Sequence, residues 1–394
     1  MIDSAPPRLE TVSSTELFRS LRNTEFPWTA ETVYLNNASI GPIPERTRRL
    51  IDQLTARRTA PYLLDSRELH AALQETRVTV ARLLGAQPEE IALATNTTYG
   101  LNLAAGSLPI RPGEKVVLSD REFPANVYPW LRLRERGVEV ELVPTIGPGW
   151  PDEARLEERL RDPRVRVLAI SSVQFASGYR ADLDRLSALC RANGTYLVVD
   201  AIQALGQVPF DVRQTPVDIL ACGGQKWLLS PWGSGFVYLR RELVAELEPV
   251  VCGWMSFEGT DDFSQLTHYH STLRHDARRA ELATLPFQDL MAMKESVALL
   301  LELGIERIEA HIRTLREPLY QLARNGRLNL VSPMDPRHDS AIVCVQPEHV
   351  AEGYHALKKA HVVCALREGT IRLAPHCYNT IEEIEKVAGI LLGE

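Results

Sequence analysis

The sequence predicts an α/β protein with a mostly parallel β-sheet, followed by a smaller α+β domain. From about residue 31 to residue 250, short apolar β-type runs alternate with helical segments. Strand–helix alternation with apolar strands is typical of a parallel sheet that is covered on both faces. After about residue 280 the pattern changes to a long amphipathic helix, further helices and a few strands. The chain of 394 residues is also longer than one simple core needs.

Three regions follow from this pattern. Residues 1–30 are polar with prolines, and predict an N-terminal arm with one short helix near "STELFRSLRN". Residues 31–280 are predicted to form the large domain, and residues 281–394 the small C-terminal domain.

The individual elements are predicted from their apolar runs and stop signals. In the large domain the predicted strands cover residues 90–95, 115–120, 139–144, 166–173, 195–201, 219–224 and 235–240, which gives a seven-stranded sheet. The predicted helices include residues 124–137 and residues 180–194, the second of which ends in Asn-Gly, a common helix stop. In the small domain we expect a helix over residues 285–304 and strands over residues 340–346 and 370–375.

Composition argues against several classes of function. The formal net charge of −7 gives no support for nucleic-acid binding, which needs a basic patch. No signal-peptide pattern opens the chain, and no apolar run approaches the roughly 20 residues that span a bilayer. The six cysteines form no C-x-x-C pair and are read as reduced thiols. We therefore expect a cytoplasmic protein with neither a nucleic-acid nor a membrane partner.

One lysine is out of place. Lys226 lies in "CGGQKWLLSPWGSG", a stretch of glycine, small and apolar residues with no neighbouring charge. A buried ammonium group is costly without a partner. Lys226 is therefore either a solvated loop residue or an amine whose desolvation and lowered pKa are useful.

Other polar and aromatic residues follow the predicted strands, where ligands of open α/β sheets bind. Thr97 and Thr98 follow residues 90–95 at a helix start, which suits an anion or an ordinary helix cap. Phe123 follows residues 115–120, either as a core contact or as a stacking surface for a planar ligand. Asp200 and Gln203 follow the apolar run "TYLVV" at residues 195–199, and a buried Asp200 needs a cation or donor. A structural ion pair between Asp200 and Arg180 is the alternative.

Pyridoxal 5′-phosphate would use this whole set of side chains. A lysine amine such as that of Lys226 forms a Schiff base with its aldehyde, and desolvation makes the amine nucleophilic. Asp200 suits the pyridine nitrogen, because a protonated ring accepts electrons. Gln203 can reach the phenolic oxygen, Phe123 can stack on the ring, and Thr97 and Thr98 suit the phosphate.

The stretch "VVDAIQALGQVPFDV…VDILACGGQKWLLSPWGSGFVYL" resembles class V aminotransferases, which are fold-type I pyridoxal-phosphate enzymes. This family also contains cysteine desulfurases, kynureninases and isopenicillin N epimerase-like proteins. The resemblance runs from "YLNNASIGPIP" to "GTIRLAPHCYNT" and implies the same roles for Lys226, Asp200 and Gln203. It further implies that Arg372 grips the substrate α-carboxylate. The segment "RAELAT" implies that Thr284 reaches the phosphate of a neighbouring subunit, in a homodimer with shared active sites.

Differences between this sequence and the family motifs reduce the number of reactions that the resemblance allows. Cysteine desulfurases carry histidines where this chain has Phe123 and Gln225, and Cys364 is too close to Arg372 to match their persulfide cysteine. "EFPAN" and "SVQFASG" look more like kynureninase, although "GGQKW" differs from its lysine loop. Family phosphate ligands before the lysine are replaced by glycines and Gln225, so backbone N–H groups and Gln225 are expected to take over that task.

The reaction itself stays open between three outcomes that share these residues. We expect an enzyme that acts on an L-amino acid through an external aldimine, foremost an aminotransferase. A carbon–sulfur or carbon–carbon lyase and an amino-acid epimerase are the alternatives. The differences would lie in pocket residues such as Asn37, Trp254, Tyr269 and His270, each of which can equally be a packing or surface residue. Of these, Asn37 is assigned to the substrate. A nicotinamide-dependent dehydrogenase is disfavoured because no G-x-G-x-x-G follows an early strand. A scaffold protein without activity is disfavoured because Lys226, Asp200 and Arg372 are all present.

Overall fold

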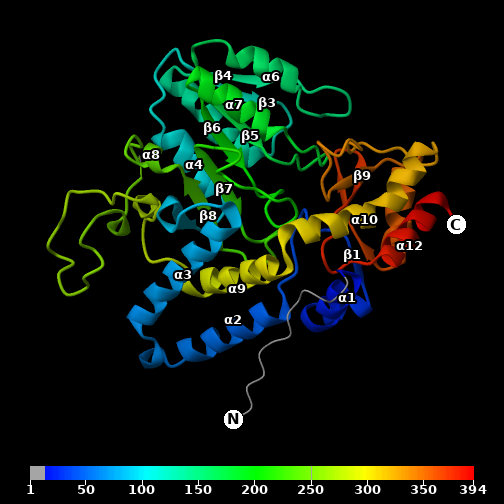
Figure 1. Cartoon of the computed structure of the whole chain (residues 1–394), viewed down its shortest axis with the longest axis horizontal. Helices are drawn as coiled ribbons and strands as arrows, with labels where there is room; N and C mark the ends of the chain where they lie inside the picture. Colours follow the sequence, from blue (N-terminus) through cyan, green and yellow to red (C-terminus); the bar gives the residue numbers. More distant parts are fainter. Residues whose placement is uncertain (1–13, 250) are drawn as a thin grey trace.

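A seven-stranded mixed sheet forms the centre of the large domain in the computed structural model, which describes residues 14–249 and 251–394 (Figure 1). Its order is β2-β8-β7-β6-β5-β3-β4, with parallel pairing from β7 to β4 and with β8 antiparallel to both of its neighbours. All seven predicted strands are confirmed. Their bounds are β2 Ile91–Ala94, β3 Lys115–Ser119, β4 Glu139–Val143, β5 Val165–Ser171, β6 Tyr196–Asp200, β7 Ile219–Gly223 and β8 Gly235–Leu239.

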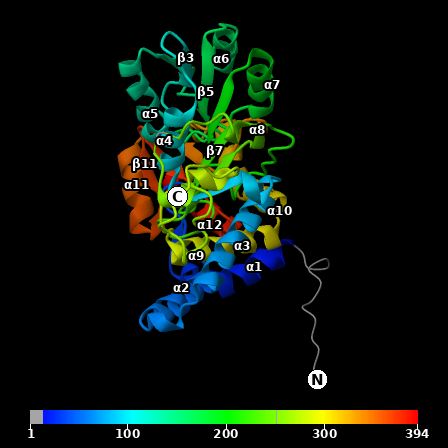
Figure 2. The same ribbon diagram turned by 90° about the vertical axis from the view of Figure 1, so that its left-hand side faces the viewer.

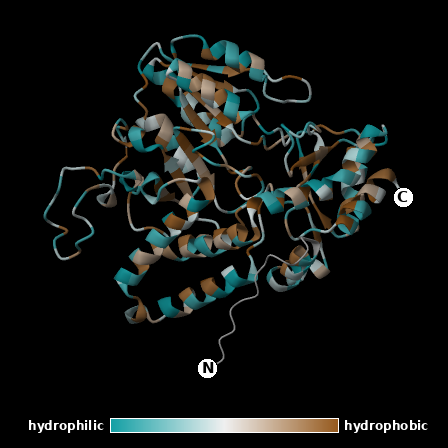
Figure 3. Cartoon of the chain, viewed as in Figure 1, coloured by the Kyte–Doolittle hydropathy of each residue, from teal (hydrophilic) through white to brown (hydrophobic). Residues whose placement is uncertain are grey.

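Helices cover both faces of this sheet (Figure 2). The α-helices are α1 Ser14–Glu25, α2 Glu45–Arg58, α3 Ser66–Leu84, α4 Thr97–Ser107, α5 Tyr128–Leu131, α6 Glu153–Leu160, α7 Leu183–Asn193, α8 Arg241–Val244, α9 Phe287–Leu303, α10 Ile305–Arg324, α11 Val350–Lys359 and α12 Ile381–Leu392. Side chains of β3 alternate between two cores, with Val116 packing into the cluster that contains Leu101 of α4, and Val117 into the cluster that contains Leu290 of α9. This alternation places the hydrophobic strands between two helical layers (Figure 3).

One predicted helix is wrong. Residues 124–137 do not form a continuous helix but three short pieces, namely η5 Pro124–Asn126, α5, and η6 Arg132–Arg136. Pro124 and Pro129 lack the N–H group that an uninterrupted helix needs, and Val127 between them has a φ of −120°. By contrast, the predicted stop of α7 is confirmed, because Gly194 caps it in the left-handed region with a φ of 67°. The helices predicted near residues 14–23 and 285–304 are confirmed as α1 and α9.

The small C-terminal domain holds a three-stranded antiparallel sheet of order β11-β12-β9. Its strands are β11 Ala365–Arg367, β12 Thr370–Leu373 and β9 Val343–Val345, so both predicted strands of this region are confirmed and β11 is an addition. The N-terminal part of the chain also reaches this region, because β1 (Val33–Tyr34) pairs with β10 (Val362–Val363). The predicted domain boundaries at residues 30 and 280 stay predictions, and residues 1–13 of the predicted arm lie outside the described residues.

Helix α10 belongs to two hydrophobic cores. Ile308 and Ile312 pack with the core of the large sheet, whereas Leu315 and Leu319 pack with strands β9 and β12 and with helix α12. One continuous helix therefore connects the large sheet with the small domain (Figure 1).

Two further features are the polarity of the helices and a long loop that leaves the large domain. Within residues 14–249 and 251–394, none of the helices combines the length and the apolar character that crossing a bilayer requires. Between η7 (Trp254–Ser256) and η8 (Ala277–Ala280), the chain extends away from the body as a long loop, on the left of Figure 1. An isolated bridge between Phe257 and Leu273 closes the base of this loop.

Candidate active site

The carboxyl ends of β6 and β7 bring Asp200 and Lys226 to the same edge of the sheet. Asp200 is the last residue of β6 and pairs in register with Ala221 of β7, and Lys226 follows three residues after the end of β7. The Nζ atom of Lys226 lies 5.5 Å from the ring centroid of Phe123, which follows β3. Neighbouring parallel strands therefore place these three predicted residues together, as expected for a ligand site of an open α/β sheet.

Asp200 is a buried carboxylate with an unused oxygen. Its side chain is 2% exposed, and Oδ1 accepts a hydrogen bond from the backbone N–H of Ile202 at 3.1 Å. Oδ2 has no hydrogen-bond partner among the described residues. Burial raises the pKa of Asp200 to about 7, against the hydrogen bond from Ile202 and the charge of Lys226. The alternative ion pair with Arg180 is wrong, because Arg180 pairs with Glu309 at 3.2 Å.

The amine of Lys226 is desolvated as the sequence suggested. Burial lowers the pKa of Lys226 to about 8, and the positive charges of Arg372 and Arg367 lower it further, while Asp200 raises it. A lower pKa increases the fraction of neutral amine near neutral pH, which is the nucleophilic form.

Gln203 is held in place by two hydrogen bonds. Its Nε2 donates to the carbonyl oxygen of Ala38 at 3.0 Å, and its Oε1 accepts from the indole N–H of Trp227 at 2.8 Å. The second N–H of its amide is not used by either bond. The sequence did not predict that Trp227, directly after Lys226, would orient this amide.

The side chains of Thr97, the first residue of α4, and of Gln225 lie close to Gly223, the last residue of β7. The backbone N–H of Gly223 donates to Oγ1 of Thr97 at 2.8 Å. A Cβ atom added to Gly223 would lie 2.5 Å from Oε1 of Gln225 and 3.3 Å from Oγ1 of Thr97, so only glycine leaves this space free. The helix is capped by Asn96, whose Oδ1 accepts from the backbone N–H of Tyr99 at 2.9 Å, so neither threonine is the cap. Thr98 lies exposed in the same first turn.

Phe123 is not a core residue. Its side chain is 42% exposed, and its ring packs edge-on against Phe175, with centroids 5.2 Å apart. The ring is therefore available for stacking on a planar ligand, as its predicted role beside pyridoxal 5′-phosphate requires.

Glu122, directly before Phe123, was missed by sequence reasoning. Its carboxylate is buried and accepts hydrogen bonds from the backbone N–H of Ser171 at 2.9 Å, from Gln174 at 2.6 Å and from Asn126 at 3.1 Å. Burial raises the pKa of Glu122, and these hydrogen bonds oppose the rise. The glutamine of "SVQFASG" was the available signal, since a buried amide requires a partner.

Arg372 lies on β12 in the C-terminal part of the chain, and Asn37 directly precedes Ala38, whose carbonyl oxygen accepts from Gln203. Arg372 is 2% exposed and donates to the carbonyl oxygen of Phe175 at 2.9 Å and to Oγ of Ser39 at 2.7 Å. Its Nε has no partner, and it forms no ion pair, within the described part of the chain. Burial lowers the pKa of Arg372 to about 10. Oδ1 of Asn37 accepts from the hydroxyl of Tyr378 at 2.7 Å, whereas its buried Nδ2 is without a described partner.

Four other predicted residues lie at the surface of this single chain. Thr284 is exposed, between η8 and α9. Trp254, at the start of the extended loop, is 39% exposed, and Tyr269 within that loop is 88% exposed. His270 is exposed beside Gly259. Their predicted roles in the site stay predictions.

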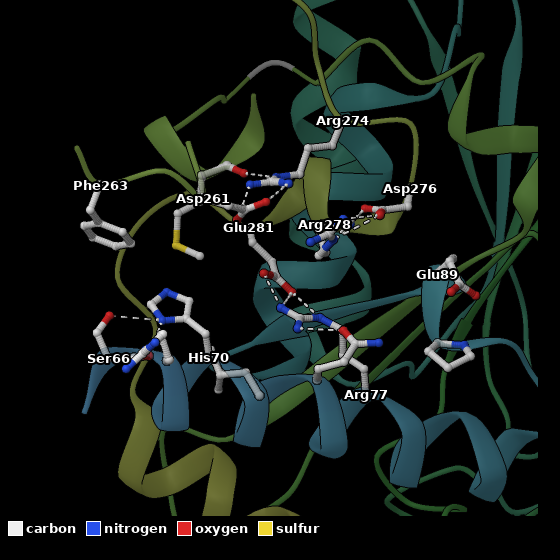
Figure 4. A pocket seen from close by; sticks show the side chains of 15 residues that line it. Ser66, His70, Arg77, Glu89, Asp261, Phe263, Arg274, Asp276, Arg278 and Glu281 are labelled. Carbon is white, nitrogen blue, oxygen red and sulfur yellow. Dashed lines mark hydrogen bonds and ion pairs between the residues drawn. The ribbon is translucent and has the colours of Figure 1, made fainter. Parts of the chain in front are cut away.

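The segment that carries Thr284 is anchored by a buried ion pair. Arg77 of α3 and Glu281 are 6% and 1% exposed at their side chains and approach to 2.6 Å. Glu281 also accepts from the backbone N–H of Leu93 at 2.9 Å. Figure 4 shows this pair at a cavity of about 520 Å³, next to the ion pair of Arg274 with Asp261. The cavity does not include Lys226 or Asp200.

Comparisons with known proteins agree with this architecture. The sequence profile of the family Aminotransferase class-V matches residues 62–387. The Bacillus subtilis protein named Uncharacterized aminotransferase YcbU is 32% identical over 304 residues, with 77% of this chain and 79% of that protein covered. Isopenicillin N epimerase of Streptomyces clavuligerus is 30% identical over 376 residues, with 91% and 94% covered.

The fold is also found in solved structures. The apo structure of a cysteine desulfurase from Thermococcus onnurineus has a TM-score of 0.84 at 23% identity, with 95% of this chain and 97% of that chain covered. At this identity the likeness supports the fold alone, and the profile and the relatives support the family. The chain belongs to the class V aminotransferase family of fold-type I enzymes that use pyridoxal 5′-phosphate.

Proposed function

We propose that this enzyme is an aminotransferase that takes the amino group from an L-amino acid, with Lys226 as its catalytic residue. The observation that carries the proposal is that a desolvated amine and a buried carboxylate, those of Lys226 and Asp200, lie at the same edge of the sheet. Arg372 adds a buried guanidinium that lacks an anionic partner among the described residues.

The residues fit pyridoxal 5′-phosphate on structural grounds. The buried Oδ2 of Asp200 has no partner in residues 14–249 and 251–394, and would accept a hydrogen bond from a protonated ring nitrogen. The space above Gly223, bounded by Thr97 and Gln225 at the start of α4, suits a phosphate because helix N-termini favour anions. The exposed ring of Phe123 would stack on the cofactor, and the unused N–H of Gln203 would donate to the phenolic oxygen.

When bound, the cofactor supplies an aldehyde that amines attack and a ring that accepts electrons from the substrate α-carbon. Nζ of Lys226 is then the base that takes the α-proton and the acid that returns it, which its pKa of about 8 suits. The planar fork of Arg372 binds the α-carboxylate in two places and fixes the orientation of the amino acid. Nδ2 of Asn37 is a second donor for the substrate.

A persulfide mechanism on a C-terminal cysteine is disfavoured by the burial of those thiols, whereas Cys252 is exposed. Cys344, Cys364 and Cys377 in the C-terminal part are buried, and burial raises the pKa of Cys344 to about 11 and that of Cys364 to about 12. Thiols held protonated in an apolar setting are poor nucleophiles. A lyase without a catalytic cysteine, and an epimerase like the Streptomyces clavuligerus relative, use the same Lys226 and are outcomes of the test below.

The role of Lys226 is tested by absorption spectroscopy of the purified holoenzyme. Lys226→Ala is expected to abolish the yellow absorption of lysine-bound cofactor, whereas the exposed Lys359→Ala keeps it. Wild-type protein that stays colourless after reconstitution with pyridoxal 5′-phosphate would contradict the assignment.

The reaction type is tested with a panel of L-amino acids and an acceptor keto acid. We expect stoichiometric formation of a keto acid and a new amino acid. Predominant sulfide or alanine would instead identify a lyase, and predominant D-isomer an epimerase.

We also propose that the active enzyme is a homodimer in which Thr284 contributes to the phosphate site of the partner subunit. The exposure of Thr284 in the single chain supports this arrangement. Mixing two inactive variants, Lys226→Ala and Thr284→Ala, is expected to restore part of the activity when their subunits exchange. No recovery despite exchange would contradict shared sites.

A further inference from the structure

Two arginines lie on the same face of the hairpin formed by β11 and β12. In the antiparallel register Ala365 pairs with Arg372, and Arg367 pairs with Thr370. Paired residues of an antiparallel ladder point to the same face, and every second residue along a strand returns to that face. Arg367 and Arg372 therefore share one face. Ala365, the partner of Arg372, is two residues before Arg367 on β11.

The turn fixes the position of Arg367. Glu368 and Gly369 connect the strands in two residues, with φ values of 46° and 78°. Positive φ at both central residues is typical of the type I′ turn, which matches the twist of a tight hairpin. Oγ1 of Thr370 also donates to the carbonyl oxygen of Arg367 at 2.9 Å. Arg367 thus stands at the end of a short hairpin whose strand β11 is at the edge of the small sheet.

The guanidinium of Arg367 has no anionic partner among residues 14–249 and 251–394. Its side chain is exposed, and its guanidinium donates to the carbonyl oxygen of the neighbouring Leu366 at 2.8 Å. Of the described carboxylates, none forms an ion pair with Arg367. Some exposed arginines of the described residues are paired, as Arg48 is with Asp52 and Arg337 with Asp335.

The positive charge of Arg367 influences the pKa values of two residues of the candidate active site, Lys226 and Arg372. After burial, the positive charges of Arg372 and Arg367 are the causes that lower the pKa of Lys226. Arg367 also lowers the pKa of Arg372, although burial has the larger effect. The carboxylate that opposes them is Asp200, which is 2% exposed and assigned to the ring nitrogen. The substrate side of the site therefore carries two uncompensated guanidinium groups.

We propose that Arg367 binds a second anionic group of the substrate, so that the enzyme acts on L-amino acids with an acidic side chain. Arg372 takes the α-carboxylate, and Arg367, one step along the same hairpin face, takes the side-chain carboxylate. This inference rests on the proposed function, because it assumes that an amino acid binds with its α-carboxylate at Arg372. An amino acid with two carboxylates would neutralise both guanidinium groups, which an uncharged amino acid cannot do.

The first test compares matched amino acids on the holoenzyme. We expect KM for L-glutamate or L-aspartate to lie at least about tenfold below that of the amide with the same shape, L-glutamine or L-asparagine. Arg367→Gln is expected to raise KM for the acidic amino acid about 10- to 100-fold, with kcat and the values for the amides nearly unchanged. Arg367→Lys keeps the charge but loses the planar fork, and should restore part of the preference. The exposed Arg132→Gln removes the same charge elsewhere and should change nothing.

The second test does not depend on turnover. Binding of glutarate and of butyrate to the holoenzyme is measured by calorimetry, and glutarate is expected to bind at least about tenfold more tightly in the wild type but not in Arg367→Gln. Equal binding of the two acids, or an equal loss for both in the variant, overturns the inference. If no amino acid reacts but glutarate still binds the wild type more tightly than Arg367→Gln, the proposed function fails and the anion site at Arg367 stands. If uncharged amino acids react as well as acidic ones, the proposed function stands and the anion site at Arg367 fails.

Discussion

The indole N–H of Trp227 donates to Oε1 of Gln203 across 2.8 Å and so connects the residue after Lys226 to the loop after β6. Trp227→Phe would leave this buried acceptor without its donor. We expect the free energy of unfolding to fall by about 1–3 kcal/mol, measured by urea denaturation. The affinity for pyridoxal 5′-phosphate should fall as well, because the amide of Gln203 is no longer oriented. Trp232→Phe is the matched control, since Trp232 is 72% exposed, and an equal loss there would contradict the explanation.

The buried carboxylate of Asp200 predicts a pH dependence of stability in the cofactor-free enzyme. Its pKa is raised by burial to about 7, above the roughly 3.9 of an unfolded chain. The folded state therefore binds more protons between these values, and stability falls as pH rises from about 4 to 7. The loss amounts to a few kcal/mol, because one pKa unit corresponds to about 1.4 kcal/mol. Asp200→Asn should flatten this part of the curve of unfolding free energy against pH, and an unchanged curve would argue against the raised pKa.

Gly41 is packed against the backbone of Lys226. Its N–H donates to the carbonyl oxygen of Gln225 at 2.8 Å, and an added Cβ would lie 2.0 Å from the carbonyl oxygen of Lys226. Gly41→Ala must therefore displace the lysine loop. We expect at least a tenfold loss of kcat/KM, equivalent to about 1.4 kcal/mol, together with a shifted cofactor absorption. In Gly389→Ala, where the new methyl group meets nothing within 4 Å, activity should stay at the wild-type level.

The ion pair of Arg77 with Glu281 predicts a large stability effect. Glu281→Ala would leave a buried guanidinium without its partner, which costs about 3–5 kcal/mol. Glu68→Ala, which breaks the more exposed pair with Arg57, should cost no more than about 1 kcal/mol. Calorimetric unfolding of the two variants provides the comparison. If Arg77→Met combined with Glu281→Ala is no more stable than Glu281→Ala, the uncompensated charge is not the cause.

Much of the fold could be predicted because its signals are local. The apolar runs of β5 and β6 are buried along their length, and the Asn-Gly stop of α7 is read directly from neighbouring residues. Residues 124–137 show the limit of such reading. Their apolar pattern suits a helix, but with Pro124 and Pro129 the segment forms three short helical pieces.

The candidate site could be predicted only where strand order brings residues together. Asp200 ends one strand of the sheet, and Phe123 and Lys226 follow two others, so the sequence alone places them near the same edge. The partners that orient site residues come from distant parts of the chain and have no local signal. Tyr378 donates to Asn37 across 341 residues, and the position of Arg367 depends on the register of β11 with β12.

The membership of α10 in two cores has a thermodynamic consequence. Ile308 is buried with the large sheet and Leu319 with the small domain, on one unbroken helix. Melting either core would remove packing from a helix that the other core needs, which makes unfolding of the two cooperative. Arg372, on β12 beside that second core, is thus positioned by the stability of the whole chain and not by the small domain alone.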